Sequence, residues 1–177
     1  MLTPAPESSL LLLIDLQTRL ALAVEGGEAA IANARRLAKG ASLLGAEILV
    51  TEQNPEKLGP TVPALAEFAS APVNKMCFNV CAAPLFPNET LAGRAVVVAG
   101  FETHVCVLQT VAALLSRGRP VLVAADAVGS RRAESKEIAL RRMERAGAAI
   151  VTTEMVLFEW LGSADHPRFR DISRLVK

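Results

Sequence analysis

Cys106 has the residue type and the position of a catalytic nucleophile. It follows the β-branched run 96–98 and a break at Gly100, and it lies about one turn into a predicted helix. The unpaired N–H groups and the positive dipole end of a helix N-terminus stabilise a thiolate, so we expect the pKa of Cys106 to be lowered. The alternative is an unreactive cysteine that packs as a small apolar side chain.

Two charged residues in apolar surroundings could assist such a thiol. Asp15 ends the apolar run 10–14, and Lys75 lies between Val73-Asn74 and Met76-Cys77-Phe78. As a general base, Asp15 would accept the thiol proton and return it to a departing amine, while Lys75 would keep the thiolate and the carboxylate charged. These residue types suit amide hydrolysis, with backbone N–H groups of the 100–106 turn receiving the oxyanion. Each also has a structural alternative, since Asp15 could cap a helix and Lys75 could reach solvent.

Alternating strands and helices must position these three residues. The sequence predicts strands at 10–15, 46–51, 72–76, 95–99, 120–125 and 148–152, and helical segments at 28–44, 62–69, 103–117, 134–146, 155–161 and 167–176. This pattern favours an α/β fold, a three-layer doubly wound (Rossmann-like) and mainly parallel sheet with helices on both faces. Ligands of such folds bind outside the carboxyl ends of the strands, where Asp15, Lys75 and Cys106 are expected.

Composition limits the classes of protein and partner. The length of 177 residues favours one domain over 1–177, and 51% of the residues are hydrophobic. No apolar run reaches the roughly 18 residues of a membrane span, and the N-terminus lacks the basic segment of a signal peptide, so we expect a cytoplasmic protein with no membrane partner. The net charge is +1, without a basic patch interleaved with aromatics, so we expect a small-molecule substrate and no nucleic acid. The three cysteines form no disulfide framework, and Cys77 and Cys81 are expected to pack in the core.

Other polar residues have structural interpretations at this stage. We expect His104 to make a hydrogen bond at the start of its helix and Asp126 to cap or brace the turn that follows it. Arg131 and Arg132 are expected on a solvated helix face.

The motifs around these residues resemble a known family. The chain is similar, over about residues 10–161, to the isochorismatase-like cysteine hydrolases, in the branch of isochorismatase-domain proteins whose substrate is unassigned. The resemblance rests on Leu-Ile-Asp-Leu-Gln at 13–17, Val-Thr-Glu-Gln at 50–53, Leu-Gly-Pro-Thr at 58–61, Lys75, and Gly-Phe-Glu-Thr-His-Val-Cys-Val at 100–107.

The resemblance implies a doubly wound α/β fold with an Asp15–Lys75–Cys106 triad. It also implies a cis peptide bond between Phe101 and Glu102, with the N–H groups of Glu102 and Cys106 as the oxyanion hole. The substrate pocket is expected to include Gln53, Asn54, Phe78 and Phe101.

The sequence departs from the metal-binding relatives of this family. Nicotinamidase-type members carry an Asp-x-His motif and further histidines between the second strand and the lysine. Here no histidine lies between Ala46 and Lys75, so we expect neither a metal nor another cofactor. Asn54 also stands where an aromatic residue commonly follows Thr-Glu-Gln.

The sequence therefore predicts a cysteine hydrolase that cleaves a small amide or related C–N bond through a thioester. One alternative is vinyl-ether hydrolysis of the isochorismatase type, which needs no thiol nucleophile. Another is a non-catalytic oligomeric scaffold with a vestigial site. The apolar content and the resemblance also favour a homo-oligomer.

Overall fold

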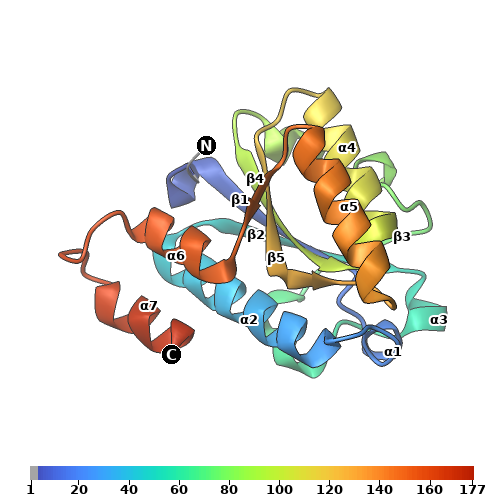
Figure 1. Cartoon of the computed structure of the whole chain (residues 1–177), viewed down its shortest axis with the longest axis horizontal. Helices are drawn as coiled ribbons and strands as arrows, with labels where there is room; N and C mark the ends of the chain where they lie inside the picture. Colours follow the sequence, from blue (N-terminus) through green and yellow to red (C-terminus); the bar gives the residue numbers. More distant parts are fainter. Residues whose placement is uncertain (1–3) are drawn as a thin grey trace.

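A six-stranded parallel sheet forms the centre of the protein, as the computed structural model describes it for residues 4–177 (Figure 1). The spatial order of the strands is β3-β2-β1-β4-β5-β6, and every neighbouring pair runs parallel. The order reverses between β1 and β4, which makes this junction the switch point where such folds bind ligands. The strands are β1 Ser9–Ile14, β2 Glu47–Gln53, β3 Val73–Lys75, β4 Ala95–Phe101, β5 Val121–Gly129 and β6 Ala149–Val151.

Helices cover both faces of the sheet, which gives the three layers that the sequence predicts (Figure 1). On one face lie α2 (Gly27–Leu44), α6 (Thr153–Leu161) and α7 (Phe169–Val176), and on the other lie α4 (Leu108–Ser116) and α5 (Ala133–Arg145). Short helices occupy the loops. They are α1 Thr18–Ala21, α3 Pro55–Leu58, a π-helical turn at Thr103–Val107, and 3₁₀ turns at Pro6–Ser8, Pro63–Phe68, Val80–Ala82 and Asn88–Leu91.

Because the central strands are buried on both faces, their sequences are continuously apolar rather than alternating. In β1, Leu11 and Leu13 pack with α2 and α6, whereas Leu12 and Ile14 pack with α4 and α5. The side chains of β4 alternate in the same way: Val96 and Val98 pack on the α4 and α5 side, whereas Val97 and Ala99 pack on the α2 and α6 side.

Gly100 permits a close approach of β4 to β1. A Cβ atom at this position would lie 2.0 Å from the Ile14 carbonyl oxygen, and the φ angle of Gly100 is +133°. The β4–β5 register also shifts between Val98 and Gly100. A glycine is therefore required where β4 leads into the Cys106 turn.

The structure differs from the predicted elements at several positions. β5 continues to Gly129, so Asp126 lies inside this strand; its Oδ1 accepts hydrogen bonds from the Thr153 N–H (2.8 Å) and hydroxyl (3.0 Å) at the start of α6. The predicted helix 103–117 begins with a π turn, and α1 and α3 form in stretches where the sequence predicted no helix. In residues 4–177, no helix combines the length and the apolar character that a membrane span needs.

Candidate active site

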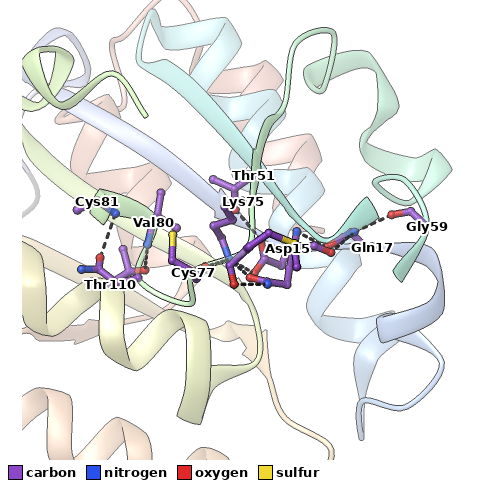
Figure 2. Close-up of polar contacts among 12 residues, drawn as sticks. Asp15, Gln17, Thr51, Gly59, Lys75, Cys77, Val80, Cys81 and Thr110 are labelled. Atoms are coloured by element: carbon purple, nitrogen blue, oxygen red, sulfur yellow. Dashed lines mark hydrogen bonds and ion pairs between the residues drawn. The ribbon is translucent and has the colours of Figure 1, made fainter. Parts of the chain in front are cut away.

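Asp15 and Lys75 form a buried ion pair at the carboxyl edge of the sheet. The distance from Lys75 Nζ to Asp15 Oδ2 is 2.6 Å, and both side chains are fully buried (Figure 2). Asp15 follows β1 with a φ angle of +52°, and its N–H donates to the Thr51 carbonyl of β2. Lys75 is the last residue of β3, which lies on the far side of β2. The Asp15 carboxylate and the Lys75 ammonium therefore meet across the end of β2. The β2 side chains in contact with them, Thr51 and Gln53, are uncharged.

Neutral groups of β2 and of the segment after β3 complete the hydrogen bonding of this pair. The Thr51 hydroxyl donates to Asp15 Oδ1 at 2.7 Å. Lys75 Nζ donates to Gln53 Oε1 at 2.8 Å and to the Cys77 carbonyl at 3.3 Å. A buried ion pair is tolerated only when its remaining polar atoms have such partners. The role of Thr51 was not predicted from the sequence, although its position at the end of a strand was a usable signal.

Gln17 holds the end of β2, which carries Gln53, against the loop that contains Gly59. Its Nε2 donates to the carbonyls of Gly59 (2.6 Å) and Gln53 (3.1 Å), and its Oε1 accepts from the Gln53 N–H (2.7 Å) (Figure 2). Thr61 pairs with Gln17 in an antiparallel bridge, and Glu52 Oε1 accepts from both the N–H and the hydroxyl of Thr61. The wall of the site is thus tied to β1 and β2 by side chains.

Cys106 lies in the π-helical turn that follows β4. The Val107 N–H and the Val105 N–H both donate to the Glu102 carbonyl, at 3.2 and 3.1 Å, which forms a wide first turn. The peptide bond between Phe101 and Glu102 is cis. Cys106 is buried and lines the same cavity as Asp15. The structure therefore brings Asp15, Lys75 and Cys106 together from three distant segments.

The ionisation of Cys106 differs from the sequence-based expectation. Burial raises the pKa of Cys106 to about 12, and the negative charge of Asp15 adds to this effect, which the Lys75 charge offsets only in part. A hydrogen bond with Asp15 raises this pKa further. The expectation of a lowered pKa was wrong because removal from water and a neighbouring carboxylate outweigh the stabilising groups. The resting thiol is protonated at neutral pH.

The cavity above Cys106 has a volume of about 350 Å³ and mostly apolar walls. Gln53 and Phe78, two of the four predicted pocket residues, line it. The complete lining is Asp15, Arg19, Leu20, Ala23, Gln53, Leu58, Phe78, Glu102, Val105, Cys106 and Arg131.

The other two predicted pocket residues lie elsewhere. Phe101 is fully buried and packs on the α2 and α6 side of the sheet with Val97 and Ala99, because alternate residues of β4 face opposite ways. Asn54 precedes α3 in a left-handed conformation and lines a neighbouring cavity with Lys57 and Cys77. Neither side chain lines the Cys106 cavity.

Arg131 and Glu102 form a second ion pair at the rim of the cavity. Arg131 Nε lies 2.8 Å from Glu102 Oε1, and the Arg131 N–H donates to the same oxygen at 3.2 Å. The Arg131 side chain is 61% exposed and that of Glu102 is 10% exposed. Arg131 lies just past β5 because this strand continues to Gly129, beyond its predicted end at 125, so the sequence prediction did not place Arg131 at a strand end. His104 makes the expected hydrogen bond at its helix start, with Nδ1 3.0 Å from the Ser130 hydroxyl.

The described residues contain no group of three or more His, Cys, Asp or Glu side chains placed to hold a metal ion. Independence from metal stays a prediction that solution experiments must test.

Comparison with known proteins identifies the family. Residues 9–155 match the family model of the Isochorismatase domain. The chain is 40% identical to mouse isochorismatase domain-containing protein 2A, an alignment that covers 97% of this chain and 84% of the mouse protein. It is 36% identical to human isochorismatase domain-containing protein 2, with the same coverage of both chains.

A solved structure shares both the fold and much of the sequence. It is described as the MAR1 ribonuclease from Caenorhabditis elegans, with a TM-score of 0.92 and 38% identity over 98% of this chain and 92% of the worm chain. The family-model match, the sequence relatives and this fold together lead to one conclusion: the chain belongs to the isochorismatase-like hydrolase family.

Proposed function

We propose that this protein hydrolyses a small amide or a related C–N bond, with Cys106 as nucleophile, Asp15 as general base and acid, and Lys75 as the fixed positive charge. The observation that carries the proposal is that Asp15, which forms a buried ion pair with Lys75, lines the same cavity as the Cys106 thiol. A volume of about 350 Å³ suits a small molecule.

The first half of the reaction forms a thioester. Because the Cys106 thiol is protonated at rest, its proton passes to Asp15 as the sulfur attacks the substrate carbonyl carbon. The C–N bond then breaks, and Asp15 gives that proton to the departing nitrogen. The acyl group remains on the Cys106 sulfur.

The second half releases the acid. A water molecule gives a proton to Asp15 as its oxygen attacks the thioester carbon, the C–S bond breaks, and the proton returns to the sulfur. The ion pair with Lys75 and the hydrogen bond from the Thr51 hydroxyl hold the Asp15 carboxylate in position throughout.

The oxyanion of both intermediates is assigned to the N–H groups of Glu102 and Cys106. Both residues line the cavity, at the start of the π turn and within it. Preorganised backbone donors at the site of developing charge commonly supply a large share of the rate enhancement. Gln53 and Phe78, which line the cavity, are proposed to contact the substrate.

Vinyl-ether hydrolysis is the first alternative, and one substitution separates it from amide hydrolysis. We propose to screen a library of small amides with wild type, Cys106→Ala and Asp15→Asn. Thiol catalysis predicts that Cys106→Ala lowers turnover by several orders of magnitude. Retention of most turnover by Cys106→Ala, with loss in Asp15→Asn, would instead favour an acid mechanism centred on Asp15. A Cys106 thiol that does not react with limiting iodoacetamide would favour the scaffold alternative.

The worm relative is described as a ribonuclease, which is a second activity to consider. For this chain we favour a small substrate, because the reacting groups lie inside a cavity rather than along an open surface. Incubation of the protein with single-stranded RNA tests this preference, and cleavage that Cys106→Ala abolishes would overturn it.

We also propose that the protein forms a homo-oligomer and acts in the cytoplasm. Large apolar side chains are exposed near the β3 end of the sheet, namely Met76 (72%), Phe78 (49%) and Leu85 (78%), and association of copies would cover them. Sedimentation analysis of the full chain tests the assembly.

A further inference from the structure

A second cavity adjoins the Cys106 cavity and is lined by donor side chains. Its volume is about 420 Å³, and its lining is His104, Arg131, Arg132 and Ser135. Arg131 lines both cavities, so a molecule that extends past it would reach from the thiol into this second space. Both arginines are exposed, as the sequence interpretation expected, but they precede α5 and do not lie on a helix face.

The donors of this cavity are largely unused by the protein. In the part of the chain that the structure describes, the Arg132 guanidinium and the Ser135 hydroxyl make no hydrogen bond or ion pair. Arg131 Nε donates to Glu102 Oε1, and the two terminal guanidinium nitrogens of Arg131 have no partner among residues 4–177. His104 uses Nδ1 for Ser130. Free guanidinium nitrogens beside a hydroxyl form a donor set that suits an anion.

The cavity is lined by two arginines and no carboxylate, so its positive charge is not neutralised from within. Glu102 is engaged by Arg131. Glu25 accepts a hydrogen bond from the Ala133 N–H at 3.1 Å, and Glu134 lies in the first turn of α5; neither lines either cavity. Arg19 adds another positive charge to the Cys106 cavity, where its guanidinium donates to the Lys57 carbonyl rather than to a carboxylate.

We infer that the substrate is an anionic amide, whose C–N bond lies at Cys106 while its negatively charged group is bound by Arg131 and Arg132. The inference rests on the proposed amide hydrolysis and adds the substrate class. A carboxylate and a phosphate share the required chemistry, because both accept paired hydrogen bonds from a guanidinium. A small anion fits better than RNA, because the cations line one cavity and the net charge of the chain is only +1.

The test compares three amide series of equal length, which end in a carboxylate, a phosphate or a neutral group. Each is assayed with wild type, Arg132→Gln and the control Arg145→Gln. Arg145 ends the same helix, is exposed and lines none of the cavities described above. Arg132 makes no side-chain cap contact, so its replacement leaves the start of α5 intact.

We expect Arg132→Gln to lower kcat/KM for anionic amides about 10- to 100-fold, mainly through KM, the scale of a lost charge-assisted hydrogen bond. Turnover of neutral amides should change less than about twofold, and Arg145→Gln should behave as wild type on all three series. The preferred anionic series then identifies carboxylate or phosphate.

Other results overturn either this inference or the proposed function. Equal turnover of neutral and anionic amides, unchanged in Arg132→Gln, would overturn the anionic substrate and leave amide hydrolysis intact. If wild type cleaves no amide, amide hydrolysis fails, and calorimetry with a dicarboxylate and inorganic phosphate decides the anion site. Binding lost in Arg132→Gln would support that site, whereas no binding, or Arg132-dependent binding of short RNA in preference to both anions, would overturn it.

Discussion

Two ion pairs border the Cys106 cavity, and they differ most in their contact with water. The Asp15–Lys75 pair has fully buried side chains and a separation of 2.6 Å, whereas the Glu102–Arg131 pair is separated by 2.8 Å and exposes 61% of its arginine. The buried pair is completed by Thr51 and Gln53, while the terminal nitrogens of Arg131 have no partner among the described residues. The first pair thus has fixed charges, and the second has donors available to a ligand.

We therefore expect the buried Asp15–Lys75 pair to act in catalysis and the exposed Glu102–Arg131 pair to act in binding. A charge removed from water acts strongly on its neighbours. Burial is the main cause of the raised pKa of Cys106, and the negative charge of Asp15 adds to it. A charge at the rim is screened by solvent and contributes little to stability, but it can bind an incoming molecule. This assignment of roles is tested by substituting the acidic residue of each pair, and then the basic residue of each pair.

The largest difference is expected in catalysis, between Asp15→Asn and Glu102→Gln. Both changes keep the side-chain shape and remove a negative charge. Asp15→Asn should lower kcat/KM about 10³- to 10⁴-fold, because an amide cannot accept the thiol proton. Glu102→Gln should lower it less than about tenfold, because the backbone N–H of residue 102 remains. Steady-state kinetics on an amide from the screen measures both, and similar losses in the two variants would contradict this assignment of roles.

The next difference concerns stability, in Lys75→Met and Arg131→Met. Lys75→Met leaves an unpaired buried carboxylate and should lower the free energy of unfolding by about 3–5 kcal/mol. Arg131→Met removes a largely exposed partner and should cost at most about 1 kcal/mol. Urea denaturation followed by circular dichroism gives both values. As a control, Asp15→Leu combined with Lys75→Met should recover part of the loss, and failure to do so would indicate another role for Lys75.

A smaller effect should appear at alkaline pH. The pKa of Cys106 is about 12 in the folded chain against an ordinary 9.0, so the unfolded chain releases this proton first. Unfolding therefore becomes easier as pH rises from about 9 toward 12, by at most about 1.4 kcal/mol per pH unit. Cys106→Ala should lack this contribution, whereas Arg131→Met should keep it. Urea titrations of the three proteins between pH 8 and 10.5 compare the slopes, and equal slopes would refute the raised pKa.

The smallest effect is expected from chelation, which should leave activity unchanged. The loop between β2 and Lys75 contains no histidine, and both ion pairs have the donors they need without a cation. Exhaustive dialysis against EDTA, followed by assay with and without added metal, is the measurement. Activity lost on dialysis and restored by zinc or manganese would show that a metal takes part.

Much of the site could be predicted from the residues at the carboxyl ends of the predicted strands. Continuous apolar runs identified the buried strands, and the rule that ligands bind at their carboxyl ends placed Asp15, Lys75 and Cys106 at one edge. The sequence did not show that Thr51 and Gln53 would complete the ion pair, because hydrogen-bond partners across strands depend on register. It also suggested the wrong direction for the pKa of Cys106, since burial depends on the whole fold.

Side-chain direction was the weaker part of the prediction. Phe101 is next to Glu102 in sequence, but strand alternation turns it to the α2 side with Val97 and Ala99. This alternation was available in the sequence and would have excluded Phe101 from the pocket. Asn54 is different, because its left-handed backbone before α3 directs it to another cavity and no periodic pattern indicates this.

The side chain of Gln17 has a consequence for how quickly a molecule can enter. Its three hydrogen bonds to Gln53 and Gly59 hold the wall of the cavity in place in the unliganded protein. Association therefore loses little conformational entropy in this segment, and no closing motion of the wall has to precede contact.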